Sequence, residues 1–161
     1  MKTKKLFVAI MLLICASQLR AYDFEYGGLY YNIINENEVE VTYKDKDEPY
    51  NINTAVIPET VTHNGKIYSV TRIGDYAFYG CSSLASVTIP QSLSKISSGA
   101  FGGCSSINSV IVRQNRPLEI SADLFKETVY QNATLYVPTG RAKYYKDAVG
   151  WAKFANIQEM E

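Results

Sequence analysis

The feature that most constrains this chain is a segment that occurs twice in succession. Residues 73–89 read IGDYAFYGCSSLASVTI and residues 96–112 read ISSGAFGGCSSINSVIV, so equivalent positions lie 23 residues apart. A fixed period of roughly 20 to 50 residues is typical of a solenoid, because one such unit cannot bury its apolar side chains alone and must stack on its neighbours. The sequence therefore predicts a short solenoid of about three coils.

Each copy ends in alternating apolar residues, which predict a short strand with one face in the core. Val87 and Ile89 flank Thr88, and successive side chains of a strand point to opposite faces. By the same pattern we expect four strands, at residues 55–58, 87–90, 110–113 and 135–138. Two ladders of equivalent residues are expected to fill the core: Ile73, Ile96 and Ile120, and Phe78, Phe101 and Phe125.

The spacing Leu84-x-x-Val87-x-Ile89 matches the core pattern of a leucine-rich repeat. Together with the preceding Ala-Phe-x-Gly-Cys-Ser-Ser, it resembles the BspA-like leucine-rich repeat family of bacterial surface and secreted proteins. Coils of that family carry the signature Ile-Gly-x-x-Ala-Phe-x-x-Cys-x-x-Leu. The ending at residues 135–138 and 150–157 also looks like the closing segment of that family. The resemblance implies a leucine-rich repeat fold and binding of partners outside the cell, and it implies no particular ligand.

The segments on either side of the coils predict caps for the two ends of the stack. Residues 22–53 contain three alternating stretches separated by turns, which predict a β-meander over the first coil. The coils extend over residues 54–138, and the first includes a hairpin at Asn64-Gly65. In residues 139–161 we expect a helix at 139–148, capped by Thr139 and followed by the apolar anchors Trp151, Phe154 and Ile157. The expected fold class is a β-rich α+β solenoid.

The first 21 residues have the pattern of a secretory signal peptide. Three lysines precede an apolar run at residues 6–16, and cleavage after Ala21 is expected. The run is too short to span a membrane as a helix. Cys15 leaves a lipoprotein alternative open, although Ile14 stands where a small residue is preferred. A secreted or cell-surface protein is therefore expected.

Charge disfavours nucleic acid as a partner. Residues 1–21 hold four of the 16 basic residues and none of the 16 acidic ones, so the mature chain has 12 basic residues against 16 acidic ones and a net charge of −4. Binding to phosphates requires a concentrated basic stripe, and the remaining lysines and arginines are scattered. No later segment has the length and apolar composition of a transmembrane helix.

The chain is poor in residues that could support catalysis. His63 is the only histidine, and its place beside an Asn-Gly turn predicts exposure to solvent. The serines recur once per coil, which is typical of turn residues and not of a unique nucleophile. No cofactor or metal pattern is present, and we expect a protein that is not an enzyme.

Two cysteines, Cys81 and Cys104, occupy the same position in consecutive coils. Stacked coils bring equivalent Cα atoms to about 5 Å, which is within the range of a disulfide. A pair of buried free thiols fits the same positions, and the sequence leaves both states open.

The residues that alternate with the buried ones predict a binding surface on the outer face of the strands. Its hydroxyl, aliphatic and aromatic side chains suit an extracellular protein or glycan as the ligand. The predicted ligand-binding residues are Val56, Ser86, Thr88, Ser109, Ile111, Thr134 and Tyr136. Adhesion or partner binding is the first hypothesis, a structural component that self-associates is the second, and a hydrolytic enzyme is the third.

Overall fold

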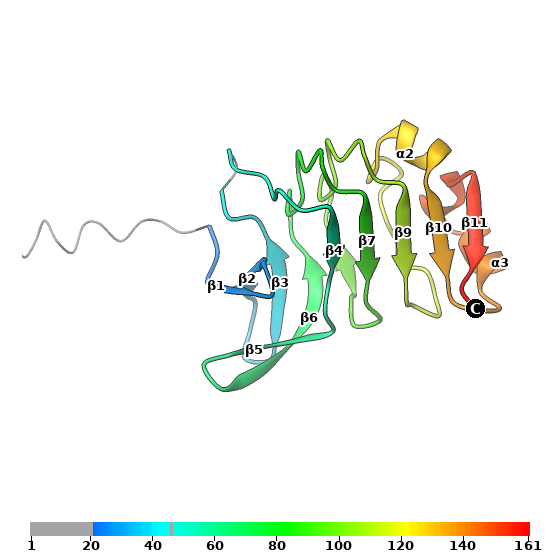
Figure 1. Ribbon diagram of the computed structural model, residues 1–161. Helices are drawn as coiled ribbons and strands as arrows, with labels where there is room; N and C mark the ends of the chain where they lie inside the picture. The colour runs from blue at the N-terminus through cyan, green and yellow to red at the C-terminus, as the bar shows by residue number, and fades with distance from the viewer. Residues whose placement is uncertain (1–20, 46) are drawn as a thin grey trace, which may run out of the picture.

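The computed structural model describes residues 21–45 and 47–161, which form an elongated stack of coils (Figure 1). The predicted signal peptide and Cys15 fall on residues outside this described part, apart from Ala21. Within the described residues, no helix has the length and apolar character needed to cross a membrane.

One side of the stack is a parallel sheet of five strands in the order β11-β10-β9-β7-β4. These strands follow one another along the long axis of the molecule (Figure 1). Their bounds are β4 Thr54–Val56, β7 Ser86–Ile89, β9 Ser109–Val112, β10 Thr134–Val137 and β11 Asn156–Glu159. Four of them are the predicted strands shifted by about one residue, whereas β11 was not predicted.

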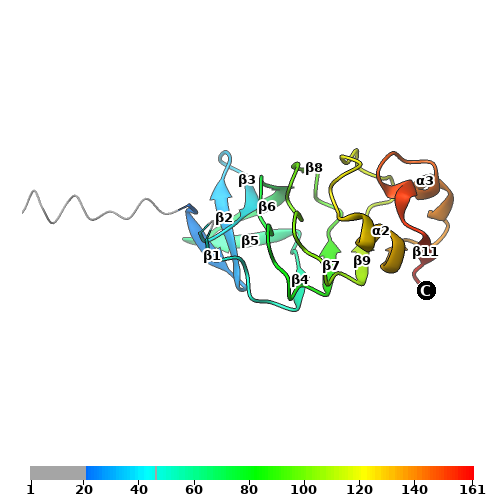
Figure 2. The same cartoon turned by 90° about the horizontal axis from the view of Figure 1, so that it is seen from above.

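A second sheet begins in the N-terminal segment and continues into the coils. It has the order β1-β2-β3-β6-β5, and β8 pairs with β6. The bounds are β1 Phe24–Tyr26, β2 Leu29–Ile33, β3 Glu38–Thr42, β5 Thr60–His63, β6 Lys66–Ile73 and β8 Lys95–Ile96. Figure 2 shows β3 and β8 on the side of the stack opposite to β4, β7 and β9.

The three predicted meander strands are present, and the last of them joins the coils directly. β3 pairs in parallel with β6, placing Val39 beside Val70 and Val41 beside Ile73. All four side chains are buried. The N-terminal segment thus shares both a sheet and a core with the first coil.

The predicted hairpin is present between β5 and β6. Asn64 and Gly65 have φ angles of 50° and 77°, the left-handed backbone that a two-residue hairpin turn requires. Asn tolerates this region better than most residues and Gly adopts it freely, which explains why the chain turns at this dipeptide.

The core of the stack contains ladders of equivalent side chains. The rings of Phe78 and Phe101 stack with centroids 5.3 Å apart, and those of Phe101 and Phe125 with centroids 5.1 Å apart. The second ladder, Ile73, Ile96 and Ile120, is also buried. Both predicted ladders are therefore confirmed.

The C-terminal segment differs from the expectation of one helix and three anchors. The helix α3 covers Ala142–Lys146 and is shorter than predicted, because Gly140 has a φ angle of 74° that no right-handed helix contains. The hydroxyl of Thr139 does not cap this helix and instead donates to the carbonyl of Met160, 2.6 Å away.

Two further elements complete this end of the chain. The short helix α2 (Glu127–Asn132), which was not predicted, precedes β10. The 3-10 helix η1 (Trp151–Lys153) carries the buried Trp151, and Phe154 is buried beside it. Ile157 belongs to β11, so the third predicted anchor is part of a strand.

Candidate functional site

The outer face of the five-stranded sheet presents side chains in two straight columns. The strands pair in register, so one outward residue of each strand lies beside its equivalent in the next. We call these ten residues the strand face: Val56, Thr88, Ile111, Tyr136 and Gln158 in one column, and Thr54, Ser86, Ser109, Thr134 and Asn156 in the other.

The strand face rests on a rigid base. The residues that alternate with it in β4, β7, β9 and β10 are buried, among them Ala55, Val87, Val110 and Leu135, each no more than 1% exposed. Because the base is packed on the core, the columns are held at the spacing of a parallel sheet, about 4.8 Å between strands. Binding groups on such a scaffold are positioned before a ligand arrives.

The predicted ligand-binding residues all lie on the strand face, but they are not equally accessible. Val56 is 62% exposed, whereas Ser86, Ser109, Ile111, Thr134 and Tyr136 are half-buried. Thr88 is only 6% exposed, which corrects the expectation that it is available to a ligand. Its side chain lies in register between Val56 and Ile111, one strand away on each side.

The strand face extends further than the sequence indicated. β11 adds Gln158 and Asn156, and the Asn156 Nδ2 atom donates to Thr134 Oγ1 over 2.7 Å. Thr54 adds a hydroxyl at the opposite end. The sequence signal for β11 is weak. Ile157 lies between polar residues, as in a strand with one inward face, but it is the single apolar residue of the segment.

The strand face carries no ionised side chain among its ten residues. It offers hydroxyl and amide groups beside the exposed Val56 and the half-buried Ile111 and Tyr136. Such a surface can form hydrogen bonds and apolar contacts but no ion pairs. It shares one property with the cores of protein interfaces, which is the depletion of charged residues.

The structure places His63 in a packing role. Its ring stacks on Phe24 with centroids 4.2 Å apart and planes 14° apart, and the side chain is half-buried. The expectation of plain exposure was therefore wrong, because the β5–β6 hairpin lies against β1. The His63 Nε2 atom lies 3.0 Å from the amide Nδ2 of Asn64, and an amide is neither an acid nor a nucleophile.

The two cysteines are buried and free, which settles the open alternative in this structure. The Cys104 thiol donates to the carbonyl oxygen of Phe78 over 2.9 Å. Its hydrogen bond with Cys81 and its burial raise the pKa of the Cys104 thiol above the ordinary value. A buried thiol that stays protonated is a poor nucleophile, so Cys104 acts as packing material.

Within the described residues, no three His, Cys, Asp or Glu side chains are grouped closely enough to hold a metal ion. In the oxygen-rich loop at residues 44–53, Lys44 and Glu48 form a surface ion pair at 3.1 Å. Both of its side chains are largely exposed, so this pair adds little to stability.

Three solved bacterial proteins share this fold. A leucine-rich repeat protein from Bacteroides ovatus matches at 20% identity and a TM-score of 0.51 over 85% of this chain and 41% of its own. A leucine-rich cell surface protein from Faecalibacterium prausnitzii matches at 19% identity and 0.55 over 91% and 44%. A leucine-rich repeat protein from Bacteroides capillosus matches at 22% identity and 0.53 over 86% and 98%.

The chain thus spans less than half the length of the first two structures and nearly all of the third. No curated protein matches the sequence significantly. The matches are to repeat proteins, and none indicates a catalytic family. The model of the BspA-type leucine-rich repeat region, which comprises six copies of the repeat, matches residues 48–139, more than half of the sequence, and the chain therefore belongs to the BspA-type leucine-rich repeat family.

Proposed function

We propose that this protein is a secreted or cell-surface binding protein without catalytic activity, and that its strand face contacts an extracellular protein or glycan. The observation that carries the proposal is the uncharged, in-register surface built on the buried base of the sheet. Adhesion is the role that such binding would serve at a bacterial surface.

The size of the strand face sets the kind of contact that it can make. Five strands at the spacing of a parallel sheet extend over about 19 Å. This length is suited to an extended peptide or a short glycan lying across the strands, and it is too small alone for a standard protein interface of about 800 Å² on each partner. We expect affinity to depend on a few side chains, with Ile111 and Tyr136 at the centre.

Binding can be tested with the mature chain, residues 22–161, on an array of extracellular matrix proteins and glycans. The double variant Ile111→Lys/Tyr136→Ala should lose a saturable interaction without losing its fold. The matched control is Ile67→Lys/Tyr144→Ala, because these two side chains are 68% and 53% exposed outside the strand face. A ligand that binds both double variants equally well would place the site elsewhere.

Export can be tested separately in a bacterium that secretes the full chain. The proposal expects a released or surface-bound protein whose mass corresponds to cleavage after Ala21. Recovery of a lipid-modified protein that begins at Cys15 would show instead that the protein is anchored to a membrane. Retention of the uncut chain inside the cell would contradict both.

Self-association is a second candidate, favoured by the open edges of the five-stranded sheet. Within the described part of the chain, β4 and β11 each pair with a single neighbour. The Ile57 N–H donates to the Thr88 carbonyl, so the N–H of the preceding Val56 points to the open edge. Edges of this kind can pair with another chain.

This candidate predicts association that increases with protein concentration in sedimentation experiments. The variant Val56→Pro removes the outward N–H and should abolish the association, whereas Val56→Ala should preserve it. A protein that remains monomeric at all concentrations would leave ligand binding as the better explanation.

A further inference from the structure

A second exposed feature lies on the loop side of the coils and begins with an unusual backbone. Tyr76 has a φ angle of 58°, the left-handed region that bulky side chains rarely adopt. Its equivalent in the next coil, 23 residues later, is Gly99, which has a φ angle of 72°. The first two copies of the repeat therefore share this backbone, and Gly adopts it without strain. Stability alone would favour Gly at position 76 as well.

A second tyrosine follows the same pattern three residues later. Tyr79 is equivalent to Gly102 of the next coil. A Cβ atom on Gly99 would lie 2.9 Å from Cε1 of Tyr76, and one on Gly102 would lie 2.8 Å from Cδ2 of Tyr79. The absence of side chains at the two glycines thus makes room for the two rings. The two rings pack against the glycines of the next coil, which has no side chains at these positions.

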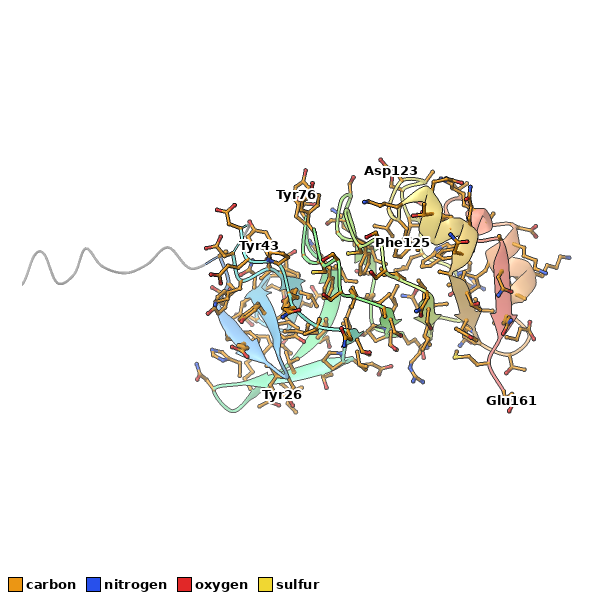
Figure 3. All side chains as sticks on the ribbon, turned by 45° about the horizontal axis from the view of Figure 1, so that its top comes forward. Tyr26, Tyr43, Tyr76, Asp123, Phe125 and Glu161 are labelled. Atoms are coloured by element: carbon orange, nitrogen blue, oxygen red, sulfur yellow. The ribbon has the colours of Figure 1, made fainter. Side chains whose placement is uncertain are left out.

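The two rings form an exposed corner. Their centroids are 5.4 Å apart and their planes meet at 81°. Tyr76 is 52% exposed and Tyr79 is 55% exposed, so part of each ring remains open to solvent. Figure 3 shows the Tyr76 side chain projecting away from the body of the molecule, on the side next to Tyr43.

This corner is one wall of a cavity between the N-terminal segment and the first full coil. The cavity has a volume of about 330 Å³. It is lined by Tyr43, Asp45, Pro49, Tyr76, Ala77 and Tyr79. Three aromatic rings and one carboxylate therefore surround a space large enough for a small organic group.

Among the described residues, the charge of the lining is negative. Asp45 is the one ionisable group among the six lining residues besides the tyrosines, and none of the six is basic. The Asp45 Oδ1 atom accepts the backbone N–H of Asp47 over 3.0 Å, which orients the carboxylate. The neighbouring Lys44 pairs with Glu48 and lines a different hollow, so it does not neutralise Asp45 within this cavity.

We propose that this cavity, which we call the tyrosine pocket, binds an organic cation, namely an alkylated ammonium group. The face of an aromatic ring carries negative potential and attracts a cation, most strongly where water is displaced. Rings that meet at a right angle enclose a compact, rounded cation on two sides, and Asp45 supplies the opposite charge. The pocket suits a sugar less well, because its lining is mostly apolar and offers no amide side chain.

The test uses the mature chain, residues 22–161, and choline chloride as the probe, with binding followed by calorimetry. We expect saturable binding and a loss of affinity of about fivefold or more for 3,3-dimethylbutan-1-ol, the uncharged analogue of the same shape. Asp45→Asn removes the charge from an exposed loop residue and should weaken choline binding without affecting the fold. Tyr76→Gly and Tyr79→Gly, which copy the next coil, should weaken it further.

The matched control is Tyr144→Ala, because Tyr144 is 53% exposed on α3, outside the pocket. It should bind choline as the unchanged chain does. Equal affinity for choline and its uncharged analogue would overturn the proposal, and so would choline binding that survives Asp45→Asn and Tyr76→Gly. Saturable binding of a neutral oligosaccharide that choline does not displace would assign the tyrosine pocket to glycans instead.

Discussion

The ring of Phe78 lies parallel to the ring of Phe101, with centroids 5.3 Å apart and 1° between the planes. Both side chains are fully buried. Equivalent residues of successive coils thus make the same contact, and each ring fills space that its own coil cannot close. The stack depends on every member, because removing one ring leaves unfilled volume against both neighbours.

Phe101→Ala is expected to lower the free energy of unfolding by about 3–5 kcal/mol, the usual loss for a buried phenylalanine. Phe101 contacts rings on both sides, Phe78 and Phe125, so the surrounding structure cannot readily collapse into the cavity. Urea unfolding followed by far-UV circular dichroism measures the change. The control, Tyr144→Ala on the surface, should remain within about 0.5 kcal/mol. Similar losses in both variants would contradict the packing of the ladder.

Two glycines with the same backbone conformation should respond differently to substitution by alanine. Gly103 has a φ angle of 82°, and a Cβ atom there would lie 3.1 Å from backbone atoms of Gly80. Gly140 has a φ angle of 74° with no atom within 4 Å of that position. We expect a loss of about 1 kcal/mol for Gly140→Ala, from strain alone. For Gly103→Ala we expect about 2–4 kcal/mol, because backbone of the adjacent coil must also move.

The difference between these two variants, measured by urea unfolding, is the useful quantity. Both remove the same conformational freedom of glycine from the unfolded chain, so that contribution cancels. Equal losses would mean that the two coils are not as close at Gly80 and Gly103 as the structure has them.

Buried tyrosines should make the protein sensitive to alkali. Burial raises the pKa of Tyr31, Tyr50 and Tyr145 above the ordinary value of tyrosine. The folded state therefore prefers the protonated form. Its stability is unaffected below the pKa of the unfolded chain, about 10, and falls above it by about 1.4 kcal/mol per pH unit for each such tyrosine.

Tyr145→Phe isolates one of these groups. The Tyr145 hydroxyl donates to the carbonyl of Gln114 over 2.8 Å, so the variant should lose about 1 kcal/mol at neutral pH. Above pH 10 its free energy of unfolding should fall less steeply with pH than that of the unchanged chain. The difference in slope corresponds to one bound proton fewer. Urea midpoints from pH 7 to 11 measure both slopes. Parallel curves would show that Tyr145 titrates normally in the folded protein.

The coils could be predicted from the sequence because their signal is repeated. The inward positions of β7 and β9 carry Val and Ile, and the ladder of Phe78, Phe101 and Phe125 recurs at nearly constant spacing. Asn64-Gly65 also predicted its turn, since few other dipeptides adopt that backbone. In each case the chemistry of a few adjacent residues determines the structure.

The remaining features depend on contacts between distant segments. β11 has one inward apolar residue, Ile157, and becomes a strand because β10 offers it a partner edge. Thr88 alternates outward as predicted, but it is only 6% exposed in the assembled sheet, which the alternation alone does not indicate. The tyrosine pocket was missed because it brings together distant loop residues such as Asp45 and Tyr76. It also depends on the positive φ angle of Tyr76, which a tyrosine in the sequence does not indicate.

Trp151 provides a test of whether the C-terminal segment caps the stack. Its side chain is fully buried, its indole N–H donates to the carbonyl of Leu118 over 2.8 Å, and its ring meets Tyr145 at 78°. Trp151→Ala should therefore lower the free energy of unfolding by about 3–5 kcal/mol.

Because Trp151 is the only tryptophan, its fluorescence reports on this end of the chain alone. If the segment caps the core, it should unfold together with the coils, and the urea transition seen by fluorescence should coincide with that seen by circular dichroism. A fluorescence transition at lower urea would show that the C-terminal segment opens first while the coils persist. In that case Leu135 and its neighbours would be protected by the coils themselves, and the segment would be an appendage and not a cap.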